Sequence, residues 1–180
     1  LGSGAVHLDN SANDVDTIAA QHSGTICYAD QDDLNVGTVT DGAKPTALIV
    51  TSNGITNDAD VGLTTLGDLT IGQLIQITGA SGDLTLDVTG SVTQTAALSA
   101  SGLQILGSGV VHLDNSANDV DTIAASHSQT ISYTDKDDLS VGTVTDTACP
   151  TPPTSGIANN ADVRLTTSGV SQAISSAVGN

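Results

Sequence analysis

The sequence predicts an all-β fold, and more narrowly a parallel β-solenoid, from three observations. Only two of the 180 residues are aromatic and Met is absent, while Val, Ile, Leu, Ala and Thr are frequent, which suits short strands. Glu is absent and Lys and Arg total three, so few residues favour exposed helical surfaces. Long stretches of sequence also recur, as is typical of solenoids.

The repeat divides the chain into two copies of one unit. Residues 1–45 and 106–150 are identical at 36 of 45 positions, including HLDNSANDVDTIAA at 7–20 and 112–125. After a variable segment, the copies resume as GITNDADVGLTT and GIANNADVRLTT, with the second copy three residues shorter. We therefore expect one continuous solenoid, with a first long repeat unit at 1–105 and a second, shortened unit at 106–180. The prolines of the variable segment predict a surface loop there. They are Pro45, Pro150, Pro152 and Pro153.

A shorter rhythm predicts the strands. Six times an Asp precedes an apolar–any–apolar alternation, which places alternate residues on one buried face. These positions are Asp33, Asp60, Asp68, Asp83, Asp138 and Asp162. The pattern predicts Leu69, Ile71, Leu84 and Leu86 in the core. It predicts Thr70 and Thr85 outside. At roughly 20 residues per coil the chain would form about nine coils.

Several segments of the sequence resemble a known family. ANDVDTIAA, ISYTDKDDLSVGTV, GDLTL and GSVTQT are similar to the shaft repeats of filamentous haemagglutinin-like adhesins, the large exoproteins of two-partner secretion and related autotransporters. The resemblance implies a right-handed parallel β-helix located at the bacterial cell surface. The NPNG-type motifs of the family's secretion domain are not present in this sequence, so the resemblance implies a shaft segment and not the export signal or the tip.

The charge pattern limits the partners. The chain has twenty aspartates but only three cationic residues, Lys44, Lys136 and Arg164, which gives a net charge of −17. This balance disfavours nucleic acid and anionic membrane surfaces, and it favours cations. No run approaches the roughly 20 apolar residues of a membrane-spanning helix. We expect an extracellular protein with no nucleic-acid partner and no membrane insertion.

Two acidic clusters are candidate calcium ligands, because three carboxylates within four residues supply the oxygen atoms that Ca²⁺ prefers. The candidates are Asp30, Asp32 and Asp33 in DQDDL and Asp135, Asp137 and Asp138 in DKDDL. Neither cluster has the glycine and distal Glu of an EF-hand loop. The alternative is a solvated turn whose first Asp accepts hydrogen bonds from backbone N–H groups. We expect no required cofactor.

The two cysteines are not repeated. Cys27 corresponds to Ser132, and Cys149 corresponds to Lys44, so we interpret both as incidental thiols. In a regular solenoid they would lie about six coils, or about 30 Å, apart. That separation exceeds disulfide reach, and a Cys27–Cys149 bridge would count against this architecture.

No motif indicates catalysis. The histidines lack metal-binding or catalytic spacing and are predicted to be exposed on strand faces, and no serine lies in GxSxG. They are His7, His22, His112 and His127. Right-handed β-helices include pectin-degrading enzymes, but those bind acidic polysaccharides with cationic groups that are scarce here. We expect no enzyme activity.

The expected function is therefore structural: an extracellular fibre or shaft segment of a large surface adhesin, with any receptor bound by parts outside this segment. The alternative is a filament, surface-layer or matrix subunit whose copies stack end to end through unpaired terminal coils. A third reading is ice binding by Thr-x-Thr, as in Thr38-Val39-Thr40, but these motifs recur once per long unit and not once per coil.

Overall fold

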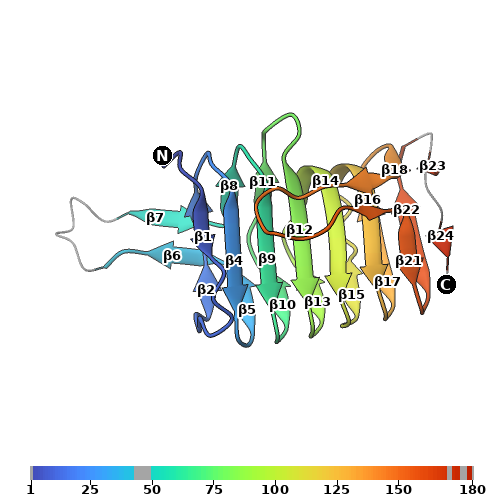
Figure 1. The fold of residues 1–180 in the computed structure, drawn as a ribbon. Helices are drawn as coiled ribbons and strands as arrows, with labels where there is room; N and C mark the ends of the chain where they lie inside the picture. Colours follow the sequence, from blue (N-terminus) through green and yellow to red (C-terminus); the bar gives the residue numbers. More distant parts are fainter. Residues whose placement is uncertain (1, 43–49, 170–171, 175–177, 180) are drawn as a thin grey trace.

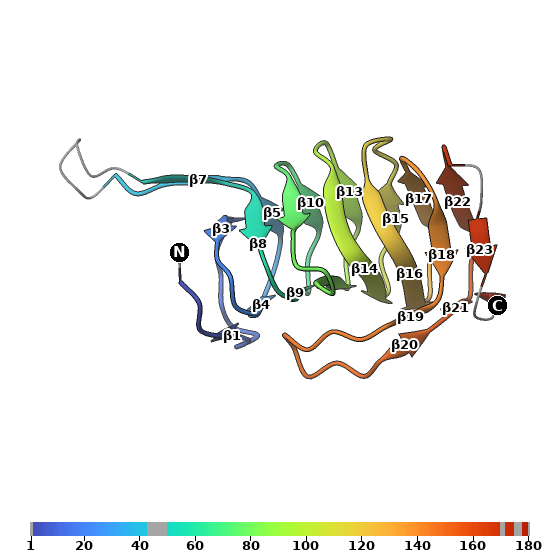
Figure 2. The ribbon, with the colours of Figure 1, turned by 90° about the horizontal axis from the view of Figure 1, so that it is seen from above.

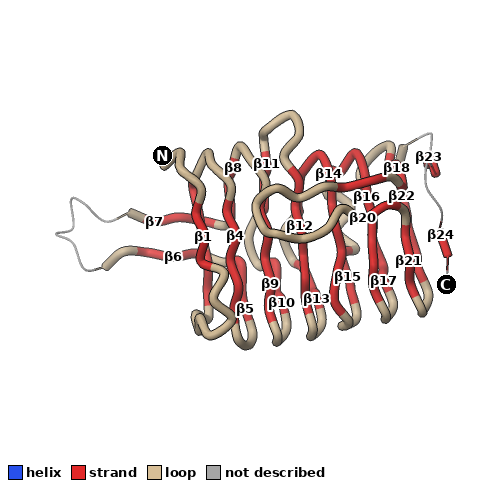
Figure 3. Tube along the Cα trace, in the orientation of Figure 1, coloured by secondary structure: helices blue, strands red, loops and turns tan. Residues whose placement is uncertain are grey.

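The computed structural model describes residues 2–42, 50–169, 172–174 and 178–179. Within these residues the chain contains strands, turns and no helix, so the expected all-β class is confirmed (Figure 1). No helix in this part is long and apolar enough to cross a membrane. Short turns join the strands, as the tube in Figure 3 shows.

The strands are short and follow the apolar alternation of the sequence. The first copy contains β1 (Val6–Leu8), β2 (Thr17–Ile18), β3 (Ala20–Gln21), β4 (Ile26–Asp30), β5 (Leu34–Val36), β6 (Thr38–Thr40), β7 (Thr51–Asn53), β8 (Ile55–Asn57), β9 (Val61–Thr65), β10 (Leu69–Ile71), β11 (Ile75–Ile77), β12 (Asp83–Val88) and β13 (Val92–Gln94). β14 (Leu98–Gly107) joins the two copies. The second contains β15 (Val111–Leu113), β16 (Asp119–His127), β17 (Ile131–Asp135), β18 (Leu139–Val141), β19 (Thr143–Val144), β20 (Thr154–Ser155), β21 (Ile157–Asn159), β22 (Val163–Thr167), β23 (Gln172–Ile174) and β24 (Val178–Gly179).

Two curled parallel sheets form the body of the molecule. One has thirteen strands and includes the path β1-β4-β9-β12-β14, with β16 pairing β14. The other has seven strands in the order β2-β5-β10-β13-β15-β17-β22. We call one strand of the seven-stranded sheet, together with the strand of the larger sheet before it, a layer. The described part of the chain therefore has seven layers and not about nine, because two hairpins leave the stack.

Aliphatic side chains fill the space between the sheets in register. Ile26 pairs with Val61, Val61 with Leu84, and Leu84 with Leu103, and all four side chains are buried. The predicted core residues Leu69, Ile71, Leu84 and Leu86 are buried as expected. Stacking like side chains on like lets branched residues pack closely without large aromatic rings.

Several equivalent strands of the two copies lie in different sheets. β4 lies in the thirteen-stranded sheet, whereas its sequence equivalent β17 lies in the seven-stranded sheet. Local pairing is nevertheless the same, because Ile26 pairs with Val61 and the equivalent Ile131 pairs with Val163. The repeat of 105 residues thus does not span a whole number of layers. Equivalent strands recur along the stack, but they do not lie directly on one another.

Two antiparallel hairpins leave the stack at equivalent positions of the repeat. β6 pairs with β7 after β5, and β19 pairs with β20 after β18. In Figure 2, β6 and β7 extend beyond the end that carries β1, while the segment between β19 and β20 runs back along the stack. We call this second segment, residues 145–153, the strap. Pro150, Pro152 and Pro153 lie in the strap, whereas Pro45 is outside the described residues.

Candidate functional site: a strap bonded across the strand stack

The strap lies on one outward-facing row of the thirteen-stranded sheet. Register pairs connect this row from strand to strand, and its side chains are small or polar, which leaves room for a covering segment. The row consists of Cys27, Gly62, Thr85, Gln104 and Ala124. All five residues are buried although they point away from the core. Thr85 therefore lies on the outward face, as predicted, but it is buried because the strap covers it.

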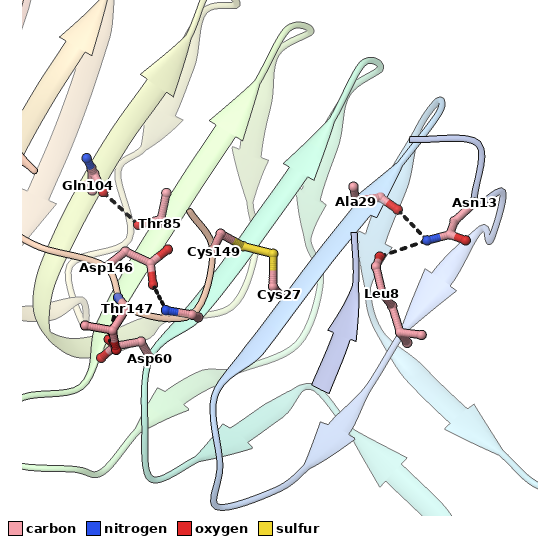
Figure 4. The surroundings of a disulfide bond; sticks show 11 residues. Leu8, Asn13, Cys27, Ala29, Asp60, Thr85, Gln104, Asp146, Thr147 and Cys149 are labelled. Carbon is pink, nitrogen blue, oxygen red and sulfur yellow. Dashed lines mark hydrogen bonds between the residues drawn. A yellow bond between two sulfur atoms is a disulfide. The ribbon is translucent and has the colours of Figure 1, made fainter. Parts of the chain in front are cut away.

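A disulfide joins the strap to β4 (Figure 4). Cys27 and Cys149 are separated by 122 residues, yet their Cα atoms lie 5.1 Å apart. The prediction of two incidental thiols about 30 Å apart was wrong. It assumed that each residue stays within its own coil, whereas the strap runs back over several layers. For the same reason, the bridge does not contradict a stack of parallel strands, as the sequence argument held that it would.

Hydrogen bonds fix the middle and the end of the strap. Gln104 Nε2 donates to the Pro152 carbonyl oxygen at 3.0 Å and to Thr154 Oγ1 at 2.6 Å. Thr85 Oγ1 in turn donates to Gln104 Oε1 at 2.9 Å. A buried amide with both ends satisfied positions the strap at little cost, since buried polar groups are unfavourable only when they lack partners.

Three carboxylates, of Asp60, Asp83 and the strap residue Asp146, lie together at the start of the strap. Asp60 Oδ2 accepts hydrogen bonds from the backbone N–H and the hydroxyl of Thr147, the former at 2.8 Å, and Asp60 Oδ1 accepts from Asp83 N at 3.0 Å. Asp146 Oδ1 accepts from Ala148 N at 2.6 Å. Asp146 Oδ2 is buried and makes no hydrogen bond within the described residues.

Burial changes the acidity of this group. Burial raises the pKa of Asp83, and the Asp60 carboxylate adds to the shift. Burial also raises the pKa of Asp146, although the hydrogen bond from Ala148 N opposes it. Desolvation and like charges both disfavour the ionised form. The strap therefore covers carboxyl groups that hold protons more tightly than exposed aspartates do.

The predicted calcium candidates include two buried residues with equivalent roles. Asp30 Oδ2 accepts from the Tyr28 hydroxyl at 2.5 Å and from Val15 N at 3.1 Å, and Oδ1 accepts from Asp32 N at 3.2 Å. Asp135 accepts the corresponding bonds from Tyr133, Val120 and Asp137. These contacts correspond to the alternative reading, in which the first Asp of each cluster fixes a turn.

These hydrogen bonds also change pKa values. Burial alone would raise the pKa of Asp30, but the bonds from Tyr28, Asp32 and Val15 outweigh it and lower the pKa. Burial and the bond to Asp30 raise the pKa of Tyr28. The carboxylate thus stays ionised and the phenol neutral.

The remaining candidates, Asp32, Asp33, Asp137 and Asp138, are exposed. Asp33 Oδ1 accepts from Asp68 N at 2.8 Å, and Asp68 Oδ1 accepts from Ser91 N at 2.7 Å. A row of aspartates therefore links successive turns through backbone N–H groups. Such bonds explain why Asp recurs at strand starts.

The histidines form two classes. His7 and His112 are exposed on strands, as predicted. His22 and His127 instead donate from Nε2 to the carbonyl oxygens of Gly4 and Gly109, each at 2.5 Å. His127 is buried, which corrects the prediction for this residue, because the layer before it supplies both packing and a carbonyl acceptor.

One group of potential metal ligands converges within the described part of the chain. His7, Asp9 and Cys27 each place a ligand atom within 4.8 Å of the others, and Cys27 is bonded to Cys149. Sequence reasoning missed this group because it treated the cysteines as unrelated to the repeated histidines. The sequence did contain one indication of the strap. The first copy has Gly62 at the position of Arg164 in the second copy, and this glycine, beside Cys27, leaves space for the strap.

Comparison of the chain with protein-family models, with curated proteins and with solved structures finds no match.

Proposed function

We propose that this chain is a structural, extracellular segment of a fibre, built as a right-handed parallel β-helix, in the shaft of a large bacterial surface adhesin of the filamentous haemagglutinin-like kind. Its parallel layers, repeated sequence and open terminal layer support this proposal. In such a shaft the segment holds a receptor-binding part away from the cell. The receptor would contact other parts of the adhesin.

The observation that carries the proposal is a difference between identical sequences. Leu113 is fully buried, but Leu8 at the equivalent position is 54% exposed. Val120 is 1% exposed, and its equivalent Val15 is 44% exposed. The sequence of the first layer is therefore suited to burial that the described residues do not provide.

The second copy shows what provides this burial. Val111 and His112 pair with Val92 and Thr93 of the layer before them. Asn118 Oδ1 accepts from Leu98 N at 3.1 Å, and Asn118 Nδ2 donates to the Leu113 carbonyl oxygen. The equivalent Asn13 keeps its bonds to Leu8 and Ala29 (Figure 4), but no layer precedes it in the described part of the chain. A further layer of the same kind would complete the first copy.

The first hairpin extends toward the side on which such a further layer would lie. The strap leaves the stack after β18 and runs toward β1, and the hairpin β6–β7 leaves after β5 and extends past β1 (Figure 2). A preceding layer would give β6 and β7 the kind of surface that the strap already has. Threonine and asparagine side chains link the two strands, with Thr38 Oγ1 donating to Asn53 Oδ1 at 2.8 Å.

The main alternative is a self-assembling filament, surface layer or matrix, in which the preceding layer belongs to another copy of this chain. Open strand edges expose backbone donors and acceptors and therefore need a neighbour. Ice binding is less favoured, because the outward row of the seven-stranded sheet is mixed. It consists of Thr17, Asn35, Thr70, Thr93, His112, Ser132 and Arg164. We propose no catalytic role.

Electron microscopy and fibre diffraction of the native assembly test the proposal. We expect fibres with a repeat of about 4.8 Å along the fibre axis, the spacing of stacked strands. Mass spectrometry of the fibre subunit separates the two readings: a chain far longer than 180 residues supports the shaft, and a subunit near 17.8 kDa supports the filament. If micrographs of the native assembly showed only discrete globular particles, both the shaft and the filament would be excluded.

A further inference from the structure

The middle of the strap, at Cys149, brings four potential metal ligands together beside β1 and β4. His7 and Cys27 are register partners on neighbouring strands, and Asp9 follows the same strand as His7. Ligand atoms of His7, Asp9 and Cys27 lie within 4.8 Å of one another. The disulfide places Cys149 Sγ directly beside Cys27 Sγ. Two sulfur atoms, one imidazole and one carboxylate therefore share a small region, in which His7 and Asp9 are exposed and both cysteines are buried.

The second copy shows that the strand geometry itself produces this convergence. At the equivalent positions, Ser132 Oγ donates to Asp114 Oδ1 at 2.5 Å, and His112 Nδ1 lies 3.7 Å from Asp114 Oδ2. His112 and Ser132 are register partners, as His7 and Cys27 are. The first copy differs in having a sulfur atom where the second has a hydroxyl, and in receiving a second sulfur atom from the strap.

We propose that reduction of the Cys27–Cys149 disulfide creates a site for a thiophilic divalent cation of the zinc class, with His7, Asp9, Cys27 and Cys149 as its ligands. The S–S bond breaks when a reductant supplies two electrons. A dithiol also supplies the two protons and becomes a disulfide, whereas a phosphine becomes a phosphine oxide and water supplies the oxygen atom and the two protons. Cation binding then displaces the two thiol protons. The strap would be attached to β4 by the disulfide under oxidising conditions and by the cation under reducing conditions.

The ligand set favours zinc over calcium. Two thiolates and an imidazole match the tetrahedral preference of Zn²⁺, whereas Ca²⁺ takes six to eight oxygen ligands. Ligand atoms around tetrahedral zinc lie about 3.5 Å apart, given bonds of about 2.0–2.3 Å. Side-chain rotations can supply the remaining approach, since His7 and Asp9 are exposed.

The test uses the whole chain, reduced with a phosphine that is then removed without oxygen. Titration with Co²⁺ and Cd²⁺ reports thiolate bonds through charge-transfer absorption, and competition with a chromophoric chelator gives the Zn²⁺ affinity. We expect one Zn²⁺ per reduced chain, no thiolate band in the oxidised protein, and protection of both thiols from alkylation. A reduced chain without a thiolate band would overturn the proposal.

Matched variants test the two ligands that are not cysteines. We expect His7→Ala and Asp9→Asn each to weaken Zn²⁺ binding at least tenfold. His112→Ala and Asp114→Asn, at the equivalent positions of the second copy, should leave it unchanged. Unaltered affinity in both first-copy variants would mean that the thiolates act without His7 and Asp9, and the proposed site would be wrong. All four positions are at the surface, so these variants should fold.

Discussion

Gly62 leaves the space that Cys149 occupies. A Cβ atom added to Gly62 would overlap Cys149 Sγ and would also lie 3.0 Å from Asp146 Oδ2. The equivalent residue of the second copy is Arg164, which is exposed. Absence of a side chain at one residue of β9 is thus a condition for the strap to reach β4.

We predict that Gly62→Arg displaces the strap. The arginine side chain would need the volume of the disulfide, so Cys27 and Cys149 should remain reduced in part of the purified protein. Thiol titration under denaturing, non-reducing conditions measures this fraction. Arg164→Gly is the matched control and should leave the disulfide intact. Full disulfide formation in the Gly62→Arg variant would show that the strap can bypass β9.

Removal of the disulfide should lower stability without changing the fold. The bridge closes a loop of 122 residues. For the Cys27→Ser, Cys149→Ser variant we expect the free energy of unfolding to fall by about 2–5 kcal/mol, because the unfolded chain is no longer constrained. Urea unfolding measures the change, and circular dichroism should still show strands. Ser132 occupies the position equivalent to Cys27, so serine is compatible with this strand. An unchanged free energy of unfolding would contradict the prediction.

Equivalent leucines should differ in their contribution to stability. Leu113→Ala removes a fully buried side chain and should cost about 2–5 kcal/mol. Leu8→Ala removes an exposed one and should cost less than about 1 kcal/mol in the isolated chain. Chemical unfolding of both variants gives the comparison. Equal costs would mean that the first layer is already covered in solution, for example by another copy, and dilution would then separate the two values.

The sequence was sufficient to predict the strands but not the strap. The Asp-apolar rhythm placed Leu69 and Leu84 in the core because strand alternation is a local property. The path of residues 145–153 depends on contacts with Asp60 and Gln104, which are remote in sequence. No local pattern encodes such contacts. The disulfide was missed because spacing along a regular coil was used as a measure of distance in space.

The repeat also predicted the strand pairing correctly, but it did not predict in which sheet each strand lies. Identical residues predicted identical pairing, and Ile26 and Ile131 do have equivalent neighbours. Their placement in opposite sheets depends on the total number of residues per layer between them. The hairpin β6–β7 and the length of each turn between the two residues set that number, so it is not a local property of either strand.

Stability should rise as the pH falls from 7 toward 5. The folded protein raises the pKa values of Asp83 and Asp146 above the ordinary 3.8, so it binds more protons than the unfolded chain between these values. The free energy of unfolding therefore decreases as the pH rises through this window. At lower pH the depressed pKa of Asp30 acts in the opposite sense, and stability is lost as that carboxylate is protonated.

Urea unfolding at pH 7, 6 and 5 measures this dependence. Asp146→Asn keeps the acceptor for Ala148 N and removes one titrating group, so its stability should change less with pH than that of the wild type. A wild-type stability that increases with pH over this range would contradict the assignment of Asp83 and Asp146 as groups that favour the protonated form. If the variant and the wild type showed the same pH dependence, Asp146 would not contribute to it, and the assignment of Asp83 would be unaffected.

Ionic strength and calcium should both raise the melting temperature. The chain carries a net charge of −17, and the exposed residues Asp33 and Asp68 of neighbouring turns are joined by a hydrogen bond. Desolvation and the Asp14 carboxylate raise the pKa of Asp32, and desolvation and Asp119 raise that of Asp137, as expected for crowded like charges. Salt weakens such repulsion, because the Debye length falls to about 8 Å at 0.15 M. Ca²⁺ should add to this effect as a counter-ion between carboxylates and not as a required ligand.

Differential scanning calorimetry separates these contributions. We expect a higher melting temperature in 0.5 M NaCl than in low salt, and a further rise in millimolar CaCl₂ at matched ionic strength. The Asp32→Asn, Asp137→Asn variant should show a smaller response to both. In EDTA the fold should persist, since Asp30 and Asp135 are held by hydrogen bonds from tyrosine and backbone groups. Unfolding on addition of EDTA would show that the acidic clusters are true calcium sites, and a melting temperature insensitive to salt and calcium would show that each aspartate is occupied by its own turn.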